Sequence, residues 1–208
     1  RMGAKPVFVD IEESTYNMDI SKIEKKITKK TKAILPVHLY GHPCDMGGIK
    51  EIAGKHSLKV IEDCAQSPNA EFKGVKVGSL GDTGCFSFYP SKNMTVCGEG
   101  GMITTNDDSV AEMARKLINH GQDGTYNHVL LGHNYRLGEI QCAIGLKQLE
   151  MLDSFTQRRR QIAKLYEDLL SDSKLVLPQE AKHAKHAYHL YVVRCDSNKR
   201  KALLNHMK

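Results

Sequence analysis

The stretch Gly84-Cys85-Phe86-Ser87-Phe88-Tyr89-Pro90-Ser91-Lys92-Asn93-Met94-Thr95-Val96-Cys97-Gly98-Glu99-Gly100-Gly101 decides how the rest of the chain is interpreted. Phe86 and Phe88 alternate with small or polar residues, which predicts a half-buried strand. Pro90 ends this strand because proline cannot donate to a β-ladder. The closing glycines permit backbone conformations that a side chain would obstruct. Lys92 is therefore predicted to lie just beyond a strand end, beside permissive backbone.

Lys92 has two interpretations, a solvated surface lysine in a hairpin or a functional amine. With 30 lysine and arginine residues in the chain, its position alone does not separate them. A second segment, Ile61-Glu62-Asp63-Cys64-Ala65-Gln66-Ser67, places acidic residues at the end of an apolar strand predicted for Leu58–Ile61. Covered sheets bind ligands at the carboxyl ends of their strands. We therefore expect the acid and the amine to share a pocket.

Strand and helix patterns alternate along the first half of the chain. Apolar stretches at residues 6–9, 32–40 and 58–61 predict strands, and amphipathic stretches at 19–27 and 46–56 predict helices. Continuous apolar strands need cover on both faces, which helices in right-handed crossovers provide. The pattern therefore predicts an α/β fold, a mostly parallel sheet covered by helices.

The second half of the chain is predicted to be mainly helical. One helix begins at Asp107-Asp108, where the carboxylates provide a cap. A long helical pattern runs from Leu137 toward Leu169, with an expected bend or break near Asp153-Ser154. A strand is predicted within residues 182–195.

Composition favours a small anionic metabolite over nucleic acid as the partner. The net charge of +6 is modest, and the one basic block, Arg158-Arg159-Arg160, is interpreted as a solvated helix face. No stretch approaches the roughly 20 apolar residues that cross a bilayer, so no membrane insertion is expected. The chain has 6 cysteines without a C-x-x-C pair and no signal-like apolar run, which favours reduced thiols and a cytoplasmic location.

Three histidines at every third position, His183, His186 and His189, raise the possibility of a metal site. Residues 187–193 are predicted to form a strand, which would separate these side chains. No metal site is therefore predicted.

Several ordered segments give the chain a specific resemblance to one family. The chain resembles the pyridoxal-phosphate-dependent sugar aminotransferases of the DegT/DnrJ/EryC1/StrS group. The matching segments are Gly3–Asp10, Pro36–Gly41, Glu62–Ser67, the Lys92 stretch with its Gly98–Gly101 tail, and Gly132–Leu137.

The resemblance implies the aspartate-aminotransferase fold. Residues 1–153 then correspond to the large cofactor-binding domain, lacking its N-terminal part. Residues 154–208 correspond to a linker helix and the beginning of a small α+β C-terminal domain. Family members are longer, so the resemblance also implies a segment before Arg1, with a Gly-Thr element for the cofactor phosphate, and a continuation beyond Lys208.

The resemblance also implies roles for individual residues. Lys92 matches the lysine that forms a Schiff base with pyridoxal phosphate (PLP), and Asp63 matches the carboxylate facing the ring nitrogen. Gln66 matches the residue near the ring 3′ oxygen, and Ser87 matches a hydroxyl donor to the phosphate. Asn134 resembles the asparagine that reaches the phosphate of the neighbouring subunit, which implies a homodimer with shared sites. Asn69 departs from the glycine common in the family, but asparagine also tolerates left-handed backbone.

The predicted function is transfer of an amino group from glutamate to a nucleotide-linked ketosugar, with a 4-keto sugar favoured. A histidine replaces the lysine in relatives that dehydrate sugars, whereas this chain keeps lysine. One alternative is a noncatalytic or truncated module of the same fold that acts in interaction or regulation. A nucleotide-binding domain using Gly98–Gly101 ranks last, because the Gly-Lys-Ser/Thr ending of a P-loop and the dinucleotide fingerprint are both missing.

Overall fold

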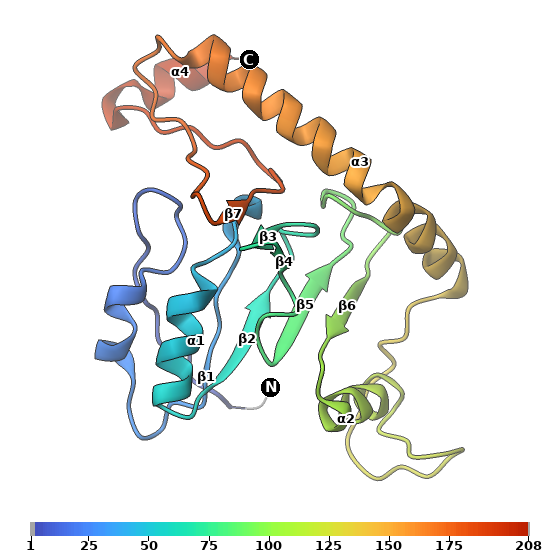
Figure 1. Ribbon diagram of the computed structural model, residues 1–208. Coiled ribbons are helices and arrows are strands. Elements are labelled where there is room, and N and C mark those ends of the chain that lie inside the picture. The colour runs from blue at the N-terminus through green and yellow to red at the C-terminus, as the bar shows by residue number, and fades with distance from the viewer. Residues whose placement is uncertain (1–2, 208) are drawn as a thin grey trace.

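The computed structural model describes residues 3–207 and has a four-stranded sheet at its centre (Figure 1). Its strand order is β1-β2-β5-β6, with bounds Ala33–Ile34, Lys59–Asp63, Thr83–Ser87 and Gly101–Thr104. β1, β2 and β5 run parallel, whereas β6 is antiparallel to β5. The predicted α/β fold with a mostly parallel sheet is confirmed.

Helix α1 (Met46–Lys55) connects β1 to β2 and covers one face of the sheet (Figure 1). The Asp45 carboxylate caps the helix by accepting bonds from the backbone N–H groups of Gly47 and Gly48. One face of α1 is buried against the sheet, and each such side chain contributes about 1.5–3 kcal/mol. The buried residues of this core include Ile34, Met46, Ile49, Ala53 and Val60.

β5 and β6 form a hairpin whose long loop carries Lys92. Ser87 pairs with Gly101 in this hairpin, so the strand predicted before Lys92 is confirmed. Met94 and Val96 of the loop are buried in a cluster that includes Leu152 of helix α3 (Glu139–Leu170). The loop is therefore fixed by packing against the core and is not a solvent-exposed flexible loop.

A second, three-stranded antiparallel sheet attaches the C-terminal part of the chain. Its order is β4-β3-β7, with bounds Val75–Lys76, Glu71–Phe72 and Ala184–Lys185. The strand predicted within residues 182–195 is therefore limited to these two residues of β7, and the strand predicted for residues 187–193 is wrong. Tyr188 has a left-handed backbone (φ 44°), which ends the extended conformation soon after β7.

Helix α3 (Glu139–Leu170) is a single helix of 32 residues, so the bend expected near Asp153-Ser154 is wrong. Such residues break helices when their side chains compete for the backbone. Here the Asp153 carboxylate accepts a bond from the Asn69 amide (2.9 Å), and the Ser154 hydroxyl donates to the Met151 carbonyl within the helix (2.7 Å). The predicted boundary between residues 153 and 154 falls inside α3, and the division into domains stays a prediction.

The remaining helices are short or lie near the C-terminus. Asp107 is the N-cap of α2 (Asp108–Ile118), as predicted. The last helical residues form η4 (Ser197–Lys199) and α4 (Arg200–His206).

The N-terminal predictions are partly wrong. Residues 6–9 form no strand, because no strand of the described part of the chain lies beside them; Phe8 is 84% exposed. The helix predicted at 19–27 is a pair of 3₁₀ turns, η1 (Ile20–Lys22) and η2 (Glu24–Lys26). So short a segment does not offset the cost of nucleating an α-helix.

The strand predicted at 32–40 is likewise shorter than expected. After β1 the chain makes one isolated bridge, between Val37 and Asp63, and then turns through η3 (Leu39–Gly41). Pro36 has no N–H for a ladder, and Tyr40 adopts a left-handed backbone (φ 57°). Both features end the strand.

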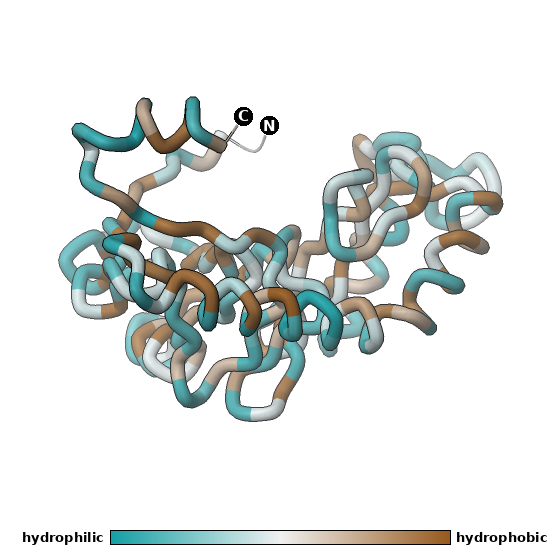
Figure 2. Tube along the Cα trace, turned by 90° about the horizontal axis from the view of Figure 1, so that it is seen from above, coloured by the Kyte–Doolittle hydropathy of each residue, from teal (hydrophilic) through white to brown (hydrophobic). Residues whose placement is uncertain are grey.

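Hydrophobic and hydrophilic residues alternate at short intervals along the trace (Figure 2). None of the helices within residues 3–207 is long and apolar enough to cross a membrane.

Candidate active site

The parallel pairing of β2 and β5 brings the acidic and the lysine-bearing segments to one edge of the sheet. Asp63, the last residue of β2, pairs with Cys85 of β5. Ser87 lies two residues further along β5, at its carboxyl end. Adjacent strands are about 4.8 Å apart, so the ends of both strands contribute to one site. The two strands are adjacent, as expected, and a pocket shared by Asp63 and Lys92 stays a prediction.

The two carboxylate oxygens of Asp63 have different surroundings. Its Oδ1 accepts a hydrogen bond from the Ala65 backbone N–H at 2.9 Å, which fixes the side chain against the turn that follows β2. Across residues 3–207 no protein group donates to Oδ2. One carboxylate oxygen is therefore oriented by the protein and the other is available to a ligand.

Lys92 is presented by a tight turn after β5. The Lys92 backbone N–H donates to the Tyr89 carbonyl at 2.9 Å, and the Tyr89 N–H donates to the Ser87 hydroxyl oxygen at 3.3 Å. The Ser87 hydroxyl therefore keeps its own hydrogen for another acceptor. The half-buried Lys92 side chain makes no ion pair within the part of the chain that the structure describes.

Gln66 contacts the backbone that crosses this edge. Its Oε1 accepts a hydrogen bond from the Tyr40 N–H at 2.7 Å, so its NH₂ group has two hydrogens for other acceptors.

Asn134 lies apart from these residues in its own chain. It forms an antiparallel bridge with Asn119, the C-cap residue of α2, and its side chain is exposed. α2 lies beyond the amino end of β5, whereas Asp63 and Ser87 lie at carboxyl ends (Figure 1). The structure therefore brings the ends of β2 and β5, with Asp63, Ser87 and the turn that carries Lys92, to one sheet edge, and leaves Asn134 exposed and apart from them.

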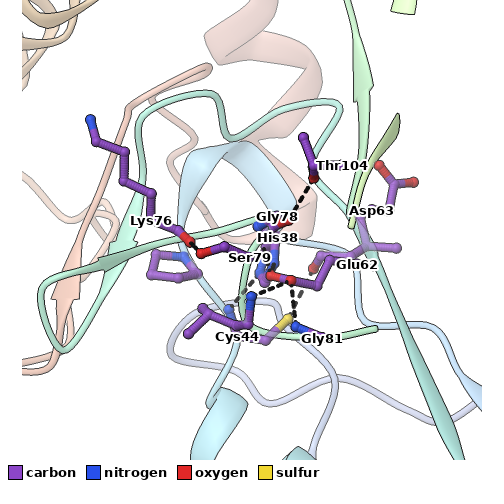
Figure 3. A network of polar contacts seen from close by, with 12 residues as sticks. His38, Cys44, Glu62, Asp63, Lys76, Gly78, Ser79, Gly81 and Thr104 are labelled. Carbon is purple, nitrogen blue, oxygen red and sulfur yellow. Dashed lines mark hydrogen bonds and ion pairs between the residues drawn. The ribbon is translucent and has the colours of Figure 1, made fainter. Parts of the chain in front are cut away.

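Glu62, next to Asp63 on β2, points into the core and forms a buried polar network (Figure 3). Its Oε1 accepts from the N–H groups of Leu80 (2.8 Å) and Gly81 (2.7 Å), and its Oε2 accepts from Gly78 N–H (2.9 Å). His38 Nε2 also donates to Oε2, at 3.0 Å. The direction of this bond follows from the Cys44 N–H, which donates to His38 Nδ1 and leaves the proton on Nε2.

This network lowers the pKa of Glu62 and leaves no atom for a metal. Burial alone would raise the pKa, but the bonds from His38, Gly78 and Gly81 outweigh it, and the pKa lies below its ordinary 4.5. Ligand-type atoms of His38, Glu62 and Cys64 lie within 4.8 Å of one another. Both His38 nitrogens and both Glu62 oxygens are already bonded, and burial raises the pKa of the Cys64 thiol. We interpret the cluster as structural.

We expect Glu62→Gln to destabilise the fold by about 3 kcal/mol at pH 7, because an amide cannot accept all four bonds and its NH₂ would face N–H donors. A carboxylate with a lowered folded pKa stabilises the protein above its unfolded pKa and loses this contribution as pH falls through the folded pKa. Urea unfolding should show a full difference between wild type and variant above about pH 5 and a shrinking one below it. An unchanged midpoint at pH 7 would contradict this role.

Comparisons with known proteins identify the family of the chain. The model of the DegT/DnrJ/EryC1/StrS aminotransferase family matches residues 1–208. The chain belongs to this family.

Two relatives of this chain have names that specify nucleotide-sugar enzymes. UDP-N-acetyl-3-dehydro-alpha-D-glucosamine 3-aminotransferase of Acidithiobacillus ferrooxidans is 45% identical over 196 residues, 94% of this chain and 53% of that protein. dTDP-3-amino-3,6-dideoxy-alpha-D-galactopyranose transaminase of Aneurinibacillus thermoaerophilus is 50% identical over 192 residues, 92% of this chain and 53% of that protein.

Among solved structures, DesV of S. venezuelae in complex with a ketimine intermediate superposes with a TM-score of 0.95. It is 40% identical, and the match covers 99% of this chain and 55% of DesV. This aminotransferase-family chain thus spans about half the length of the curated relatives it matches.

Two side chains near the site were missed by sequence reasoning. Asn93, beside Lys92, is buried and contacts His189, which lies 96 positions away in the chain. No local pattern signals such a contact. The spacing of His189 with two other histidines raised only a metal site, which a strand was expected to exclude. In the structure the left-handed Tyr188 separates His189 from β7.

Proposed function

We propose that the protein containing this chain transfers an amino group to the keto carbon of a nucleotide-linked sugar, using PLP held on Lys92. The observation that carries the proposal is that β2 and β5 bring Asp63, Ser87 and the turn with Lys92 to one sheet edge, where each has a polar atom without a partner in residues 3–207. Membership of an aminotransferase family supports the same reaction.

The unused polar atoms fit the chemical groups of PLP. An amine can bond to the aldehyde of PLP, and a carboxylate oxygen can pair with its protonated ring nitrogen. A hydroxyl can donate to its phosphate, and an amide NH₂ can donate to its ring oxygen. Lys92, Asp63, Ser87 and Gln66 supply these groups in that order. When bound, PLP supplies an electron sink for the substrate carbon that loses a proton.

The protein groups then hold the cofactor and move protons. Asp63 Oδ2 favours the protonated ring nitrogen by electrostatic attraction, with its orientation fixed through Oδ1. Lys92 Nζ would take up the proton that the substrate carbon loses, which requires a neutral amine for part of the cycle. Ser87 Oγ would donate to the phosphate, while the Tyr89 N–H holds that oxygen in place.

The proposed substrate is a nucleotide-activated 4-keto sugar, with glutamate as amino donor. Two relatives whose names specify UDP and dTDP sugars support the nucleotide-linked class, and both names specify carbon 3. Carbon 4 rests on the run from Asn119 to Arg136, which resembles family members that aminate that position. Substrate orientation against Lys92 determines which carbon reacts.

A direct test incubates the complete protein with glutamate and purified nucleotide sugars carrying the keto group at carbon 3 or at carbon 4. We expect a new amine at carbon 4, located by NMR. Exclusive amination at carbon 3 would contradict the regiochemistry. Turnover with free amino acids and keto acids alone would contradict the substrate class.

We further propose a homodimer with shared sites, because Asn134 is exposed and lies apart from Lys92 in its own chain. Mixing Lys92→Ala subunits with Asn134→Ala subunits should restore about one quarter of wild-type turnover after random exchange. Half of the dimers are then mixed, and one of their two sites regains both residues.

The control for subunit mixing pairs Lys92→Ala with Asp63→Asn. Both residues serve a site in the same chain, so no mixed dimer has an intact site and no recovery is expected. Equal recovery in both mixtures, or none in either after verified exchange, would argue against a contribution of Asn134 across the interface.

A further inference from the structure

The segment around His189 crosses closely over the turn that follows β1. Ala187 N–H donates to the Gly41 carbonyl at 2.9 Å, and His189 N–H donates to the Tyr40 carbonyl at 2.8 Å. A Cβ on Gly41 (φ +98°) would lie 2.9 Å from the Tyr188 nitrogen, so only glycine allows this approach. The crossing fixes the backbone of His189 beside the Gln66 contact, since Gln66 holds the N–H of the same Tyr40.

Arg159 of α3 fixes the crossing from the other side. Its guanidinium donates to the carbonyls of Tyr188 (3.2 Å) and His189 (3.4 Å). The neighbouring Arg160 pairs with Glu180 at 2.7 Å, so the basic triplet is not merely the solvated face that its composition suggested. The left-handed Tyr188 carries backbone strain, which persists where surrounding contacts over-determine a conformation.

The Asn93 amide determines which His189 ring nitrogen carries the proton. Asn93 Nδ2 donates to the Ala187 carbonyl at 2.9 Å, and this carbonyl can only accept. Asn93 Oδ1 is therefore the atom that faces His189 Nδ1, at 3.1 Å, and Nδ1 must donate. Neutral imidazole has one donor and one acceptor, so His189 Nε2 is an acceptor. Within residues 3–207 no group donates to it.

Lys92 is the residue next to Asn93, and its charge acts on His189. Burial, followed by the charges of Lys92 and of Arg159, lowers the pKa of His189 to about 4. The imidazole is therefore neutral at physiological pH and adds no positive charge beside the lysine.

We propose that His189 is a positioning residue for Lys92: on a turn of its side chain the Lys92 amine would donate a hydrogen bond to His189 Nε2, while Asn93 holds His189 Nδ1. Neither His189 Nε2 nor the Lys92 amine has another partner in the described chain. Lys92 precedes Asn93 in the backbone, and His189 is joined to Asn93 by the hydrogen bond at Nδ1. This inference rests on the proposed function in that Lys92 is the reactive amine. It assigns to the C-terminal segment a direct part in orienting that amine.

A matched pair of variants separates this role from simple anchoring. In the complete protein, His189→Asn keeps a donor for Asn93 but has no acceptor that reaches Lys92. His189→Gln places an amide oxygen near the position of Nε2. We expect capture of PLP by Lys92, measured as borohydride-reduced peptide against time, to slow about tenfold or more in His189→Asn and to recover in His189→Gln. The reverse order would overturn the proposal, because it is the order that a purely structural bond to Asn93 predicts.

A second measurement needs neither PLP nor turnover. NMR of histidine-labelled, PLP-free complete protein should show His189 protonated on Nδ1 when neutral. Lys92→Met should raise the pKa of His189 toward its ordinary 6.5 and shift the Nε2 resonance. Lys147→Met, which removes an exposed α3 lysine paired with Glu150, is the control and should change neither. An unmoved His189 in Lys92→Met would overturn the proposal, even if PLP is attached to Lys92; PLP on another lysine would overturn only the proposed function.

Discussion

Replacement of Lys92 by alanine should abolish covalent attachment of PLP and reduce turnover to the level of the uncatalysed reaction. The Lys92 amine stands beyond β5, at the same sheet edge as Asp63, and no side chain within residues 3–207 forms an ion pair with it. Without the amine, the site loses the group proposed to bond to the cofactor aldehyde and to move the substrate proton.

The measurement is borohydride reduction of the complete protein followed by peptide mapping. In wild type the reduced cofactor should lie on the peptide containing Lys92, and the variant should carry none. Lys76→Ala is a suitable control, because Lys76 lies on β4 and contacts Asn69 and Asp153. Reduced cofactor on any other lysine in wild type would refute the assignment. Loss of fold is checked by circular dichroism of the variant.

Asp63→Asn should lower turnover by about 100-fold or more while much of the cofactor binding is retained. The amide oxygen can still accept the bond from Ala65 N–H, so the position of the side chain is preserved. The charge that would favour a protonated ring nitrogen is lost, and the ring withdraws electrons less effectively.

Cofactor affinity and turnover must be measured separately for this variant, since the expected result is a fall in kcat with a smaller change in PLP binding. Asp168→Asn, which removes an exposed carboxylate paired with Lys164 on α3, should behave as wild type. Near-normal kcat in Asp63→Asn would remove Asp63 from this role. A large loss of PLP would instead indicate that the carboxylate mainly binds the cofactor.

For Asp63 and Glu62, the local sequence pattern predicts the direction of the side chains but not their partners. Alternation along β2 predicts that these neighbours point to opposite faces, and the structure confirms it (Figure 3). Pattern alone does not predict that Glu62 gathers the N–H groups of residues 78–81 and the His38 ring. Those donors become neighbours only when the turn before β5 folds back over β2.

At α3 and at the N-terminal stretch, local pattern predicts the wrong secondary structure. Asp153 and Ser154 are helix-breaking residues by local preference, yet the helix continues, because Asn69 engages the carboxylate from another part of the fold. Residues 6–9 have a strand-like pattern, yet no strand lies beside them within residues 3–207. Secondary structure at these sites depends on neighbours that periodicity does not specify.

The sequence by itself determined the α/β class, the delivery of Asp63 and Lys92 to strand ends, and the family, because hydrophobic periodicity, proline, glycine and short motifs act locally along the chain. Only the tertiary structure decided that β2 and β5 are adjacent, that Asn134 lies apart from Lys92, and that His189 joins Asn93 across 96 positions. The physical reason is that a side-chain hydrogen bond between distant segments leaves no periodic pattern in either segment. It forms only after backbone pairing and core packing have placed the two groups together.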